Sequence, residues 1–287
     1  MSAKTKAKAV SRLPKRSRAK KSPVQVAPAP KSRTEAARPR AKVAAEATPA
    51  VRRVRSPRPA RDAWKKITDP LRGRKGIRVL FYGITGKGKT HGIADLLDYV
   101  LDEGLAELVL IHDVKLPEVQ YSGAVIHEAT AIYTPEGAPD AYPAVRVLRK
   151  RDLDHMPSVE TGARVTLESG YKDITTIFVI DEFQRALTDG GKFESQSTRR
   201  IFCEGLGMHA SVIAGKQLPQ YTPTEATAQS TVVYFGLNSE GANFLLDEKK
   251  VSKEMWEIIT ALTVTQFLVV PQEGDWDGEV YEVPNRA

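Results

Sequence analysis

Short apolar runs and longer amphipathic stretches alternate along most of the chain. The run 77–82 is rich in strand-forming residues and is bounded by Gly76 and Gly83, which is typical of a buried strand. The stretch 92–101 carries apolar residues at three- and four-residue spacing, which predicts an amphipathic helix. Together they predict a strand that leads through a glycine-rich turn into a helix.

The same alternation continues toward the C-terminus. Buried strands are predicted over 106–113, 174–180, 211–215 and 231–237, and short strands over 124–127 and 144–148. Helices are predicted over 159–167, 195–209, 240–246 and 253–262, a surface turn over 149–154, a mobile loop over 188–192, and a terminal hairpin from 265–270 and 279–283. Such alternation predicts an α/β fold with a mainly parallel central sheet flanked by helices.

The first part of the chain has a different composition. Residues 1–61 contain 19 Lys or Arg and two acidic residues, whereas the rest of the chain contains 24 basic and 33 acidic residues. This segment has no aromatic residue and several prolines, so it cannot bury enough apolar surface to offset its conformational entropy. We therefore expect a disordered basic tail over 1–62 and one folded domain over 63–287.

The basic tail predicts an anionic partner, and nucleic acid is the interpretation favoured by its charge, since lysines and arginines release counterions from phosphates. A capsid or vertex protein is a further candidate partner. Three alternatives stay open: a solubilising segment, a leader that is processed, and a mitochondrial transit peptide, which the prolines disfavour.

Cysteine content and hydropathy limit the cellular compartments in which the chain is expected. The single Cys203 excludes an intramolecular disulfide and agrees with a reducing compartment. No run approaches the roughly 18 apolar residues that a membrane span requires, and the N-terminus lacks the apolar core of a secretory signal.

The turn after the strand 77–82 has the spelling of a phosphate-binding loop. Gly83-Ile84-Thr85-Gly86-Lys87-Gly88-Lys89-Thr90 fits G-x-x-x-x-G-K-[ST]. Glycines let backbone N–H groups point at phosphate oxygens, and the helix N-terminus adds partial positive charge. We expect residues 83–91, His91 included, to bind ATP, Lys89 to reach the β- and γ-phosphates, and the Thr90 hydroxyl to bind Mg²⁺.

A second nucleotide motif ends the strand 174–180. Four apolar residues run into Asp181 and Glu182, as in the Walker B motif of P-loop ATPases. We expect Asp181 to hold Mg²⁺, which keeps several waters and takes few protein ligands. Glu182 is expected to act on the water that attacks the γ-phosphate. A strand ending in acids is common alone, but its pairing with the phosphate loop predicts hydrolysis.

Gln217 follows the strand 211–215. Ligands of parallel sheets bind at the carboxyl ends of the strands, so Gln217 is expected near Lys89 and Asp181. It is a candidate sensor of the γ-phosphate or the attacking water, and the alternative is an ordinary polar turn residue.

These segments resemble the FtsK–HerA superfamily of DNA-pumping ATPases. The resemblance rests on GITGKGKT at 83–90, IFVIDEF at 177–183 and GLGMHASVIAGKQLPQ at 205–220, with weaker support from TVVYFGLNSEGANFLLD at 231–247. It implies a P-loop NTPase fold of the RecA-like, additional-strand type. His112-Asp113-Val114-Lys115 stands where the family often has Asp-Pro-Lys; the proline is missing, so no role is carried over.

The resemblance also implies a ring-shaped homo-oligomer, usually a hexamer, in which an arginine of one subunit completes the neighbouring site. Such an arginine stabilises charge on the transferring phosphoryl group. Arg200 and its neighbour Arg199 are the candidates, although most helix arginines are surface residues.

The short chain with a basic tail resembles the genome-packaging ATPases of tailless, membrane-containing icosahedral viruses. This implies an ATP-hydrolysing double-stranded DNA translocase located in the virion or host cytoplasm, or in the cytoplasm if the protein is cellular. Alternatives are a nucleotide-gated assembly or export factor of the phage-morphogenesis kind, a cellular HerA-like translocase, and a small P-loop kinase. The absence of an Asn-Lys-x-Asp segment argues against a GTPase.

Overall fold

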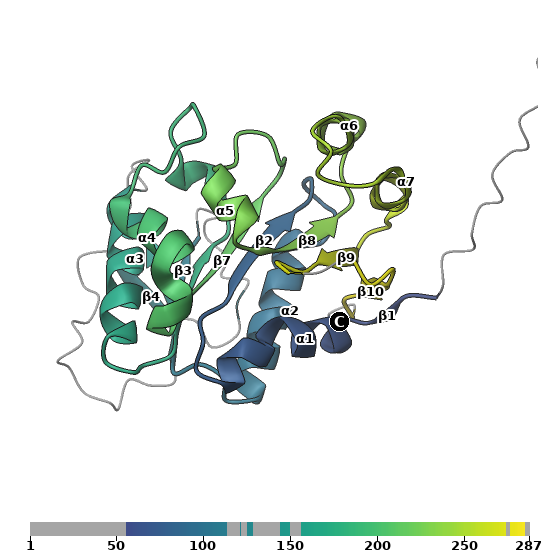
Figure 1. Cartoon of the computed structure of the whole chain (residues 1–287). Helices are drawn as coiled ribbons and strands as arrows, with labels where there is room; N and C mark the ends of the chain where they lie inside the picture. Colours follow the sequence, from purple (N-terminus) through teal and green to yellow (C-terminus); the bar gives the residue numbers. More distant parts are fainter. Residues whose placement is uncertain are drawn as a thin grey trace, which may run out of the picture. The chain divides into compact units, whose positions relative to one another are not determined.

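A computed structural model describes residues 56–113, 121, 125–128, 144–149, 156–273 and 276–284. These residues form three layers, with helices on both faces of a central sheet (Figure 1). The strands are β1 Arg58–Pro59, β2 Arg78–Tyr82, β3 Leu108–His112, β4 Val125–Glu128, β5 Ala144–Arg149, β6 Thr176–Ile180, β7 Ala210–Lys216, β8 Thr231–Phe235, β9 Gln266–Val270 and β10 Val280–Glu282.

The sheet has the order β1-β10-β9-β8-β2-β7-β6-β3-β5-β4. All its pairings are parallel except those of β9, which runs antiparallel to both β8 and β10. The predicted C-terminal hairpin is therefore confirmed as β9 and β10. Strand β7 lies between β2, which leads into the phosphate loop, and β6, which ends at Asp181. This inserted strand confirms the additional-strand type of P-loop fold.

The helices divide between the two faces of the sheet. They are α1 Ala60–Arg72, α2 Lys89–Asp102, α3 Met156–Gly170, α4 Gln196–Glu204, α5 Thr224–Ala228, α6 Ser239–Asp247 and α7 Lys253–Ala261, with short 3-10 helices η3 Phe183–Ala186 and η4 Gly205–Met208. Buried residues of α1 and α2 share one core with the sheet, and those of α3 to α7 share the core on the opposite face.

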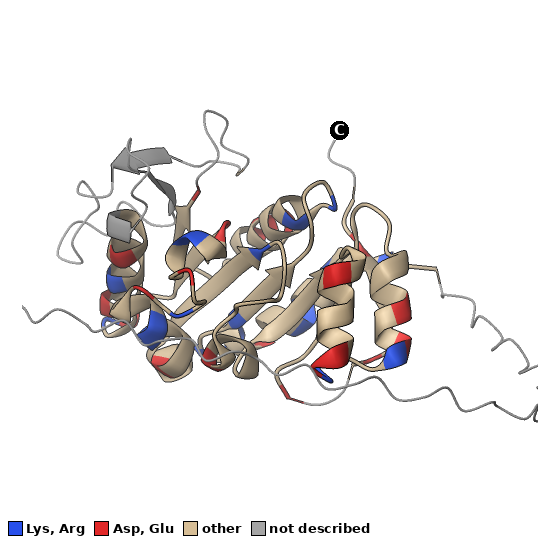
Figure 2. Ribbon diagram, turned by 90° about the horizontal axis from the view of Figure 1, so that it is seen from above, with Lys and Arg blue, Asp and Glu red and all other residues tan. Residues whose placement is uncertain are grey.

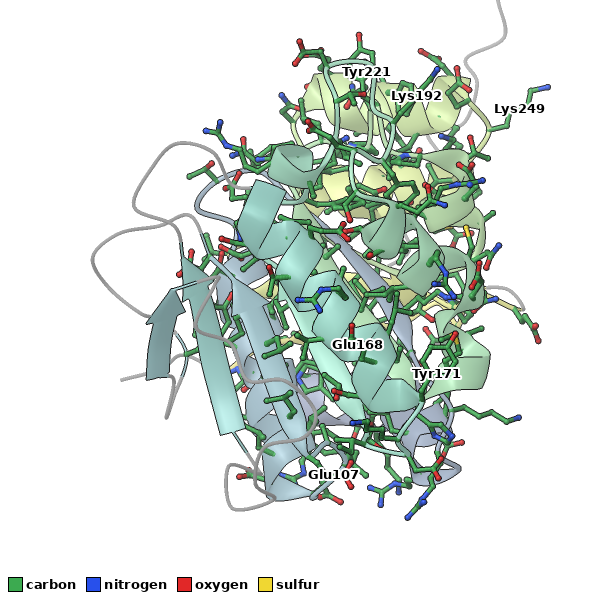
Figure 3. All side chains as sticks on the ribbon, turned by 90° about the vertical axis from the view of Figure 1, so that its left-hand side faces the viewer. Glu107, Glu168, Tyr171, Lys192, Tyr221 and Lys249 are labelled. Carbon is green, nitrogen blue, oxygen red and sulfur yellow. The ribbon has the colours of Figure 1, made fainter. Side chains whose placement is uncertain are left out.

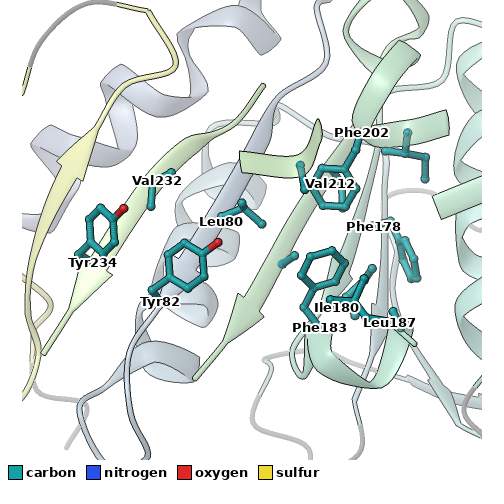
Figure 4. Packing of buried hydrophobic residues seen from close by; sticks show 14 of the residues in the cluster. Leu80, Tyr82, Phe178, Ile180, Phe183, Leu187, Phe202, Val212, Val232 and Tyr234 are labelled. Atoms are coloured by element: carbon teal, nitrogen blue, oxygen red, sulfur yellow. The ribbon is translucent and has the colours of Figure 1, made fainter. Parts of the chain in front are cut away.

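The alternation of side chains along each central strand fills both cores. On β2, Val79 and Phe81 face α2, whereas Leu80 and Tyr82 face the other layer, where Tyr82 stacks on Tyr234 of β8 at 5.7 Å (Figure 4). Because both faces are covered, these strands are continuous apolar runs, which explains why they could be recognised in the sequence.

The predicted boundary at residue 62 is wrong. Strand β1 pairs with β10, and α1 begins at Ala60, so folded structure extends into the predicted tail. Trp64 is 1% exposed and stacks on Phe267 at 4.8 Å, and its Nε1 donates to Asp95 at 2.7 Å. The apolar positions of α1 do have helical spacing, but Pro70 and the basic flanking sequence obscured it. The disorder of residues 1–55 stays a prediction, because they lie outside the described residues.

The helix predicted over 195–209 is shorter than expected. Helix α4 ends at Glu204 and continues as η4, and a Cβ on Gly205 would lie 2.7 Å from the carbonyl oxygen of Ala210. Because Gly205 packs closely on β7, the chain continues after Glu204 as the 3-10 helix η4 rather than as further turns of α4. The loop predicted over 188–192 is a hydrogen-bonded turn closed by a bridge between Leu187 and Phe193; its mobility stays a prediction.

Charged side chains lie mainly on the helices and turns around the sheet (Figure 2). Among the described residues, no helix combines the length and the hydropathy that crossing a bilayer requires. Of the surface turn predicted over 149–154, Arg149 ends β5 and residues 150–154 lie outside the described residues, as does the connection between β4 and β5.

Candidate active site

The phosphate loop starts between the ends of two neighbouring strands. The backbone N–H of Gly83 donates to the carbonyl of Lys216 at the end of β7 (3.2 Å), and that of Ile84 donates to Gly236 after β8 (3.2 Å). Gly86 and Gly88 have φ values of +83° and +92°, which glycine adopts without steric cost. The loop therefore has the curled backbone that its spelling predicts.

Two glycines are required by packing on Phe235. A Cβ on Gly83 would lie 2.7 Å from the Phe235 Cβ, and one on Gly92 would lie 2.4 Å from the Phe235 Cζ. Gly92 lies in the first turn of α2, so its missing side chain lets this helix approach β8. The helix N-terminus is thereby fixed at the loop.

The segment between α7 and β9 holds the outer side of the loop. Lys87 donates through Nζ to the carbonyl of Leu262 (3.1 Å), and its own carbonyl accepts from the Thr265 N–H (3.3 Å). The Lys87 N–H donates to Ile84 (3.3 Å). The Lys87 side chain, predicted to bind nucleotide, is thus bound to the protein itself, and no sequence pattern had linked residues 262–265 to the loop.

Lys89, Thr90 and Asp181 lie together at the carboxyl ends of β2, β7 and β6. The Thr90 hydroxyl donates to the Asp181 carboxylate at 3.1 Å. Lys89 is 7% exposed, and its ammonium lies 3.3 Å from the position that a Cβ of Gly215 would occupy. Asp181 is fully buried, and its backbone N–H donates to the His112 carbonyl at 3.1 Å. The structure thus brings the two motifs together as predicted.

The Thr90 and Asp181 side chains fit a magnesium ion. Both offer hard oxygen ligands from rigid elements, and two protein ligands agree with the preference of Mg²⁺ for retaining several waters. No cluster of three or more His, Cys, Asp or Glu suited to a metal occurs in the described part of the chain. Thr90 and Asp181 are therefore the candidate metal ligands among the described residues.

Glu182 is held by a neighbour that sequence reasoning missed. The Gln184 side-chain amide donates to the Glu182 carboxylate within the same turn. Gln184 belongs to η3, whose start directly after β6 places both residues beside Asp181. This contact holds the Glu182 carboxylate on its own turn, and the polar side chain of Gln184, two residues downstream, was the signal available in the sequence.

Tyr121 and Asp113 also lie close to Asp181. The Tyr121 hydroxyl is buried, and its pKa is raised well above the usual range, first by burial and then by the negative charges of Asp181 and Asp113. Asp113 is 3% exposed at the end of β3. A neutral hydroxyl therefore accompanies the two carboxylates, and no pattern in the sequence identified Tyr121.

Two further candidate site residues, Gln217 and His91, are next to residues that form or contact the phosphate loop. Gln217 is exposed and directly follows Lys216, whose carbonyl accepts from Gly83. His91 lies in the first turn of α2, and its Nε2 is buried without a hydrogen-bond partner among the described residues. Both positions agree with the expected site, and their roles stay predictions.

Arg199 and Arg200 bind acidic residues of their own chain. Arg200 donates to Glu204 (3.0 Å) and to the hydroxyl of Tyr171 (3.3 Å). Arg199 lies 3.8 Å from Glu225. Figure 3 shows Tyr171 toward the end of the molecule opposite Tyr221 and Lys192. Arg199 lines a cavity of about 500 Å³ together with Lys192 and Tyr221.

No protein-family profile matches the chain, and no curated protein matches it. Among solved structures, it is similar to the genome packaging NTPase B204 of Sulfolobus turreted icosahedral virus 2. The complex with ATP-gammaS has a TM-score of 0.55 and 15% identity over 76% of this chain and 100% of that one. The AMP complex gives 0.54 and 16% over 73% and 98%.

The bacterial conjugative coupling protein TrwBdeltaN70 is also similar, with a TM-score of 0.50 and 11% identity over 77% of this chain and 86% of that one. These likenesses show that the chain has the fold of P-loop ATPases of this kind. The resemblance expected from the motifs is therefore confirmed at the level of the fold.

Proposed function

We propose that the chain is an ATP-hydrolysing double-stranded DNA translocase that packages a viral genome. The observation that carries the proposal is the meeting of the two nucleotide motifs, with the Thr90 hydroxyl 3.1 Å from Asp181 and the Lys89 ammonium beside Gly215. Glu182 follows Asp181 directly, so cation, metal ligands and base share one edge of the sheet.

Each residue of the proposed active site has a separate role in ATP hydrolysis. Lys89 and the curled backbone of the phosphate loop bind the phosphates, and Thr90 and Asp181 hold Mg²⁺. The metal, when bound, neutralises charge on the phosphate oxygens. Glu182 orients the attacking water and accepts its proton, which requires that its carboxylate turn from Gln184 toward the water. Gln217 senses the γ-phosphate.

DNA translocation is supported by the fold and by the charge of the chain. B204, which shares the fold, is described as a genome packaging NTPase. The first 61 residues carry 19 basic side chains, which suit a tether to duplex phosphates or to a capsid vertex protein. A ring, with six subunits as the expected number, encloses the duplex, and Arg199 or Arg200 acts on the neighbouring subunit's nucleotide. The virion or the host cytoplasm is the corresponding location.

The test compares ATP hydrolysis by the full chain with and without duplex DNA. We expect DNA to stimulate the rate and the variants Lys89→Ala and Glu182→Gln to abolish it, because they remove the phosphate-binding cation and the base. Lys172→Met, which changes an exposed lysine after α3, is the matched control and should behave as wild type.

Hydrolysis that duplex DNA leaves unchanged would contradict the translocase and favour a nucleotide-gated assembly or export factor. Normal turnover by the Glu182→Gln variant would contradict the role of that carboxylate.

A further inference from the structure

Lys216 ends β7 with its side chain on the face of the sheet opposite the phosphate-loop helix. Along β7, Ile213 packs in the core with α2, whereas Val212 and Ala214 pack in the core with α3 to α7. Alternation places Gly215 toward Lys89 and Lys216 toward the other face. Lys216 is only 6% exposed, which is unusual for a lysine.

The buried ammonium holds the loop that connects β7 to α5. It donates to the carbonyl of Gln220 and to the hydroxyl of Thr222 (3.3 Å), and that hydroxyl in turn lies 2.9 Å from the Pro219 carbonyl, to which it donates. Pro219 and Pro223 have no backbone N–H. Side-chain hydrogen bonds from Lys216 therefore supply donors to a loop whose own backbone offers few.

This loop contacts the phosphate loop and the turn 188–191. The Lys216 carbonyl accepts from Gly83, the first residue of the phosphate loop (3.2 Å). Tyr221 packs on the turn 188–191, which follows η3, since a Cβ on Gly191 would lie 2.4 Å from the Tyr221 carbonyl oxygen.

The tip of the loop has an unusual backbone conformation. Tyr221 is 74% exposed and has a φ of +55°, which non-glycine residues seldom adopt. Figure 3 shows its side chain at the same end of the molecule as Lys192. The surrounding contacts therefore fix a conformation that the isolated loop would not prefer.

We infer that Lys216 is a positioning residue that pins the loop 217–223 to β7 and thereby holds Gln217 at the phosphate loop. Gln217 lies between two fixed points, the Lys216 carbonyl bound to Gly83 and the Gln220 carbonyl bound to the Lys216 ammonium. Without the ammonium, the loop is bound to β7 only at its start, and the Thr222 hydroxyl keeps a contact with Tyr82 of β2. The inference rests on the proposed function, because it requires ATP hydrolysis in which Gln217 takes part.

The test is a double-mutant cycle in the full chain with the variants Lys216→Met, Gln217→Ala and both together. Methionine is unbranched and fills nearly the same space up to Cε, but it lacks the ammonium and its donors. We expect each single variant to lower kcat on the order of 10- to 100-fold, because small misplacements near reacting groups have effects of that size. The double variant should be no slower than the slower single variant, since the two residues act as a unit.

Binding of a fluorescent ATP analogue separates positioning from loss of the site. Its Kd should change by less than about twofold in Lys216→Met, because Lys89 and the phosphate loop are unchanged, and additive losses in kcat would overturn the inference. If Lys216→Met does not fold, Thr222→Val and Thr222→Ser replace it: valine removes the hydroxyl partner and should slow turnover, and serine retains the hydroxyl and should not.

Failure of the inference is distinguishable from failure of the proposed function. Wild-type turnover in Lys216→Met, or in Thr222→Val if that variant replaces it, overturns the inference and leaves the function intact. If Lys216→Met lowers turnover but Gln217→Ala turns over at the wild-type rate, Lys216 does not act by positioning Gln217, and the inference is overturned. No ATP hydrolysis by the wild-type chain overturns the proposed function and the inference with it.

Discussion

Gly215→Ala tests whether the spacing between β7, Asp181 and Lys89 sets the geometry of the site. A Cβ on Gly215 would lie 2.6 Å from the Asp181 carbonyl oxygen, 3.1 Å from Ile93 Cδ1 and 3.3 Å from the Lys89 ammonium. The first distance is too short for any real carbon–oxygen contact, and its partner is backbone. The substitution must therefore move β6 away from β7 or rotate the residue.

Overpacking of this kind costs about 1–3 kcal/mol of unfolding free energy. For a domain of this size, each kcal/mol corresponds to roughly 2–4 °C in melting temperature. Asp181 follows β6, so the same displacement changes its position relative to Thr90, and a shift of about 1 Å near the reacting groups lowers turnover on the order of 100-fold. We expect a larger loss of activity than of stability.

The assay combines denaturant unfolding with steady-state ATP hydrolysis. Gly207→Ala is the matched control, because a Cβ there meets nothing within 4 Å and its backbone is not in the left-handed region. It should leave stability within about 0.5 kcal/mol and turnover unchanged. If Gly215→Ala matched Gly207→Ala in both measurements, close approach at Gly215 would not be what sets the site.

Three further expectations concern pH, the domain boundary and the metal. Burial lowers the pKa of Lys216 from 10.5 to about 8, so between those pH values the unfolded chain binds more protons and the free energy of unfolding rises with pH. Unfolding by denaturant at pH 7.5 and 9.5 should show this rise in the wild-type chain and not in Lys216→Met. An equal rise in the two proteins would refute the expectation. Above pH 10 Tyr82, whose pKa burial raises to about 12, acts in the opposite direction. Removing residues 1–55 should leave the melting temperature unchanged. Removing residues 1–62 should lower it by roughly 2–8 °C, because β1 and the first turn of α1 are lost. Equal melting temperatures of the two shortened chains in a thermal scan would contradict this expectation. Asp181→Asn should reduce the effect of Mg²⁺ on ATP-analogue affinity on the order of tenfold, and titrations with and without Mg²⁺ that match wild type would exclude its role as ligand.

The sequence alone predicted the order of the central elements and the two nucleotide motifs. Buried parallel strands are continuous apolar runs, and the phosphate loop needs glycines at fixed spacing, so both are local patterns. The predicted strands that became β2, β3, β6, β7 and β8 each match within a few residues, because burial on both faces makes their central positions apolar and leaves polar residues mainly at the strand ends.

Helix α1 shows where local pattern was insufficient. Its apolar positions have helical spacing, but they follow a long basic segment and include Pro70. What makes this segment fold is the stacking of Trp64 on Phe267, more than 200 positions later in the chain. A contact of that range has no local signature.

Only the tertiary structure decided which side chains meet at the site. It placed β7 between β2 and β6, joined Lys87 to Leu262, Glu182 to Gln184 and the Lys216 ammonium to the following loop. The sequence determined which chemistry the chain carries, because a motif specifies residue types at short range. The fold determined which residues hold that chemistry in place, because such contacts arise from the packing of elements far apart in the chain.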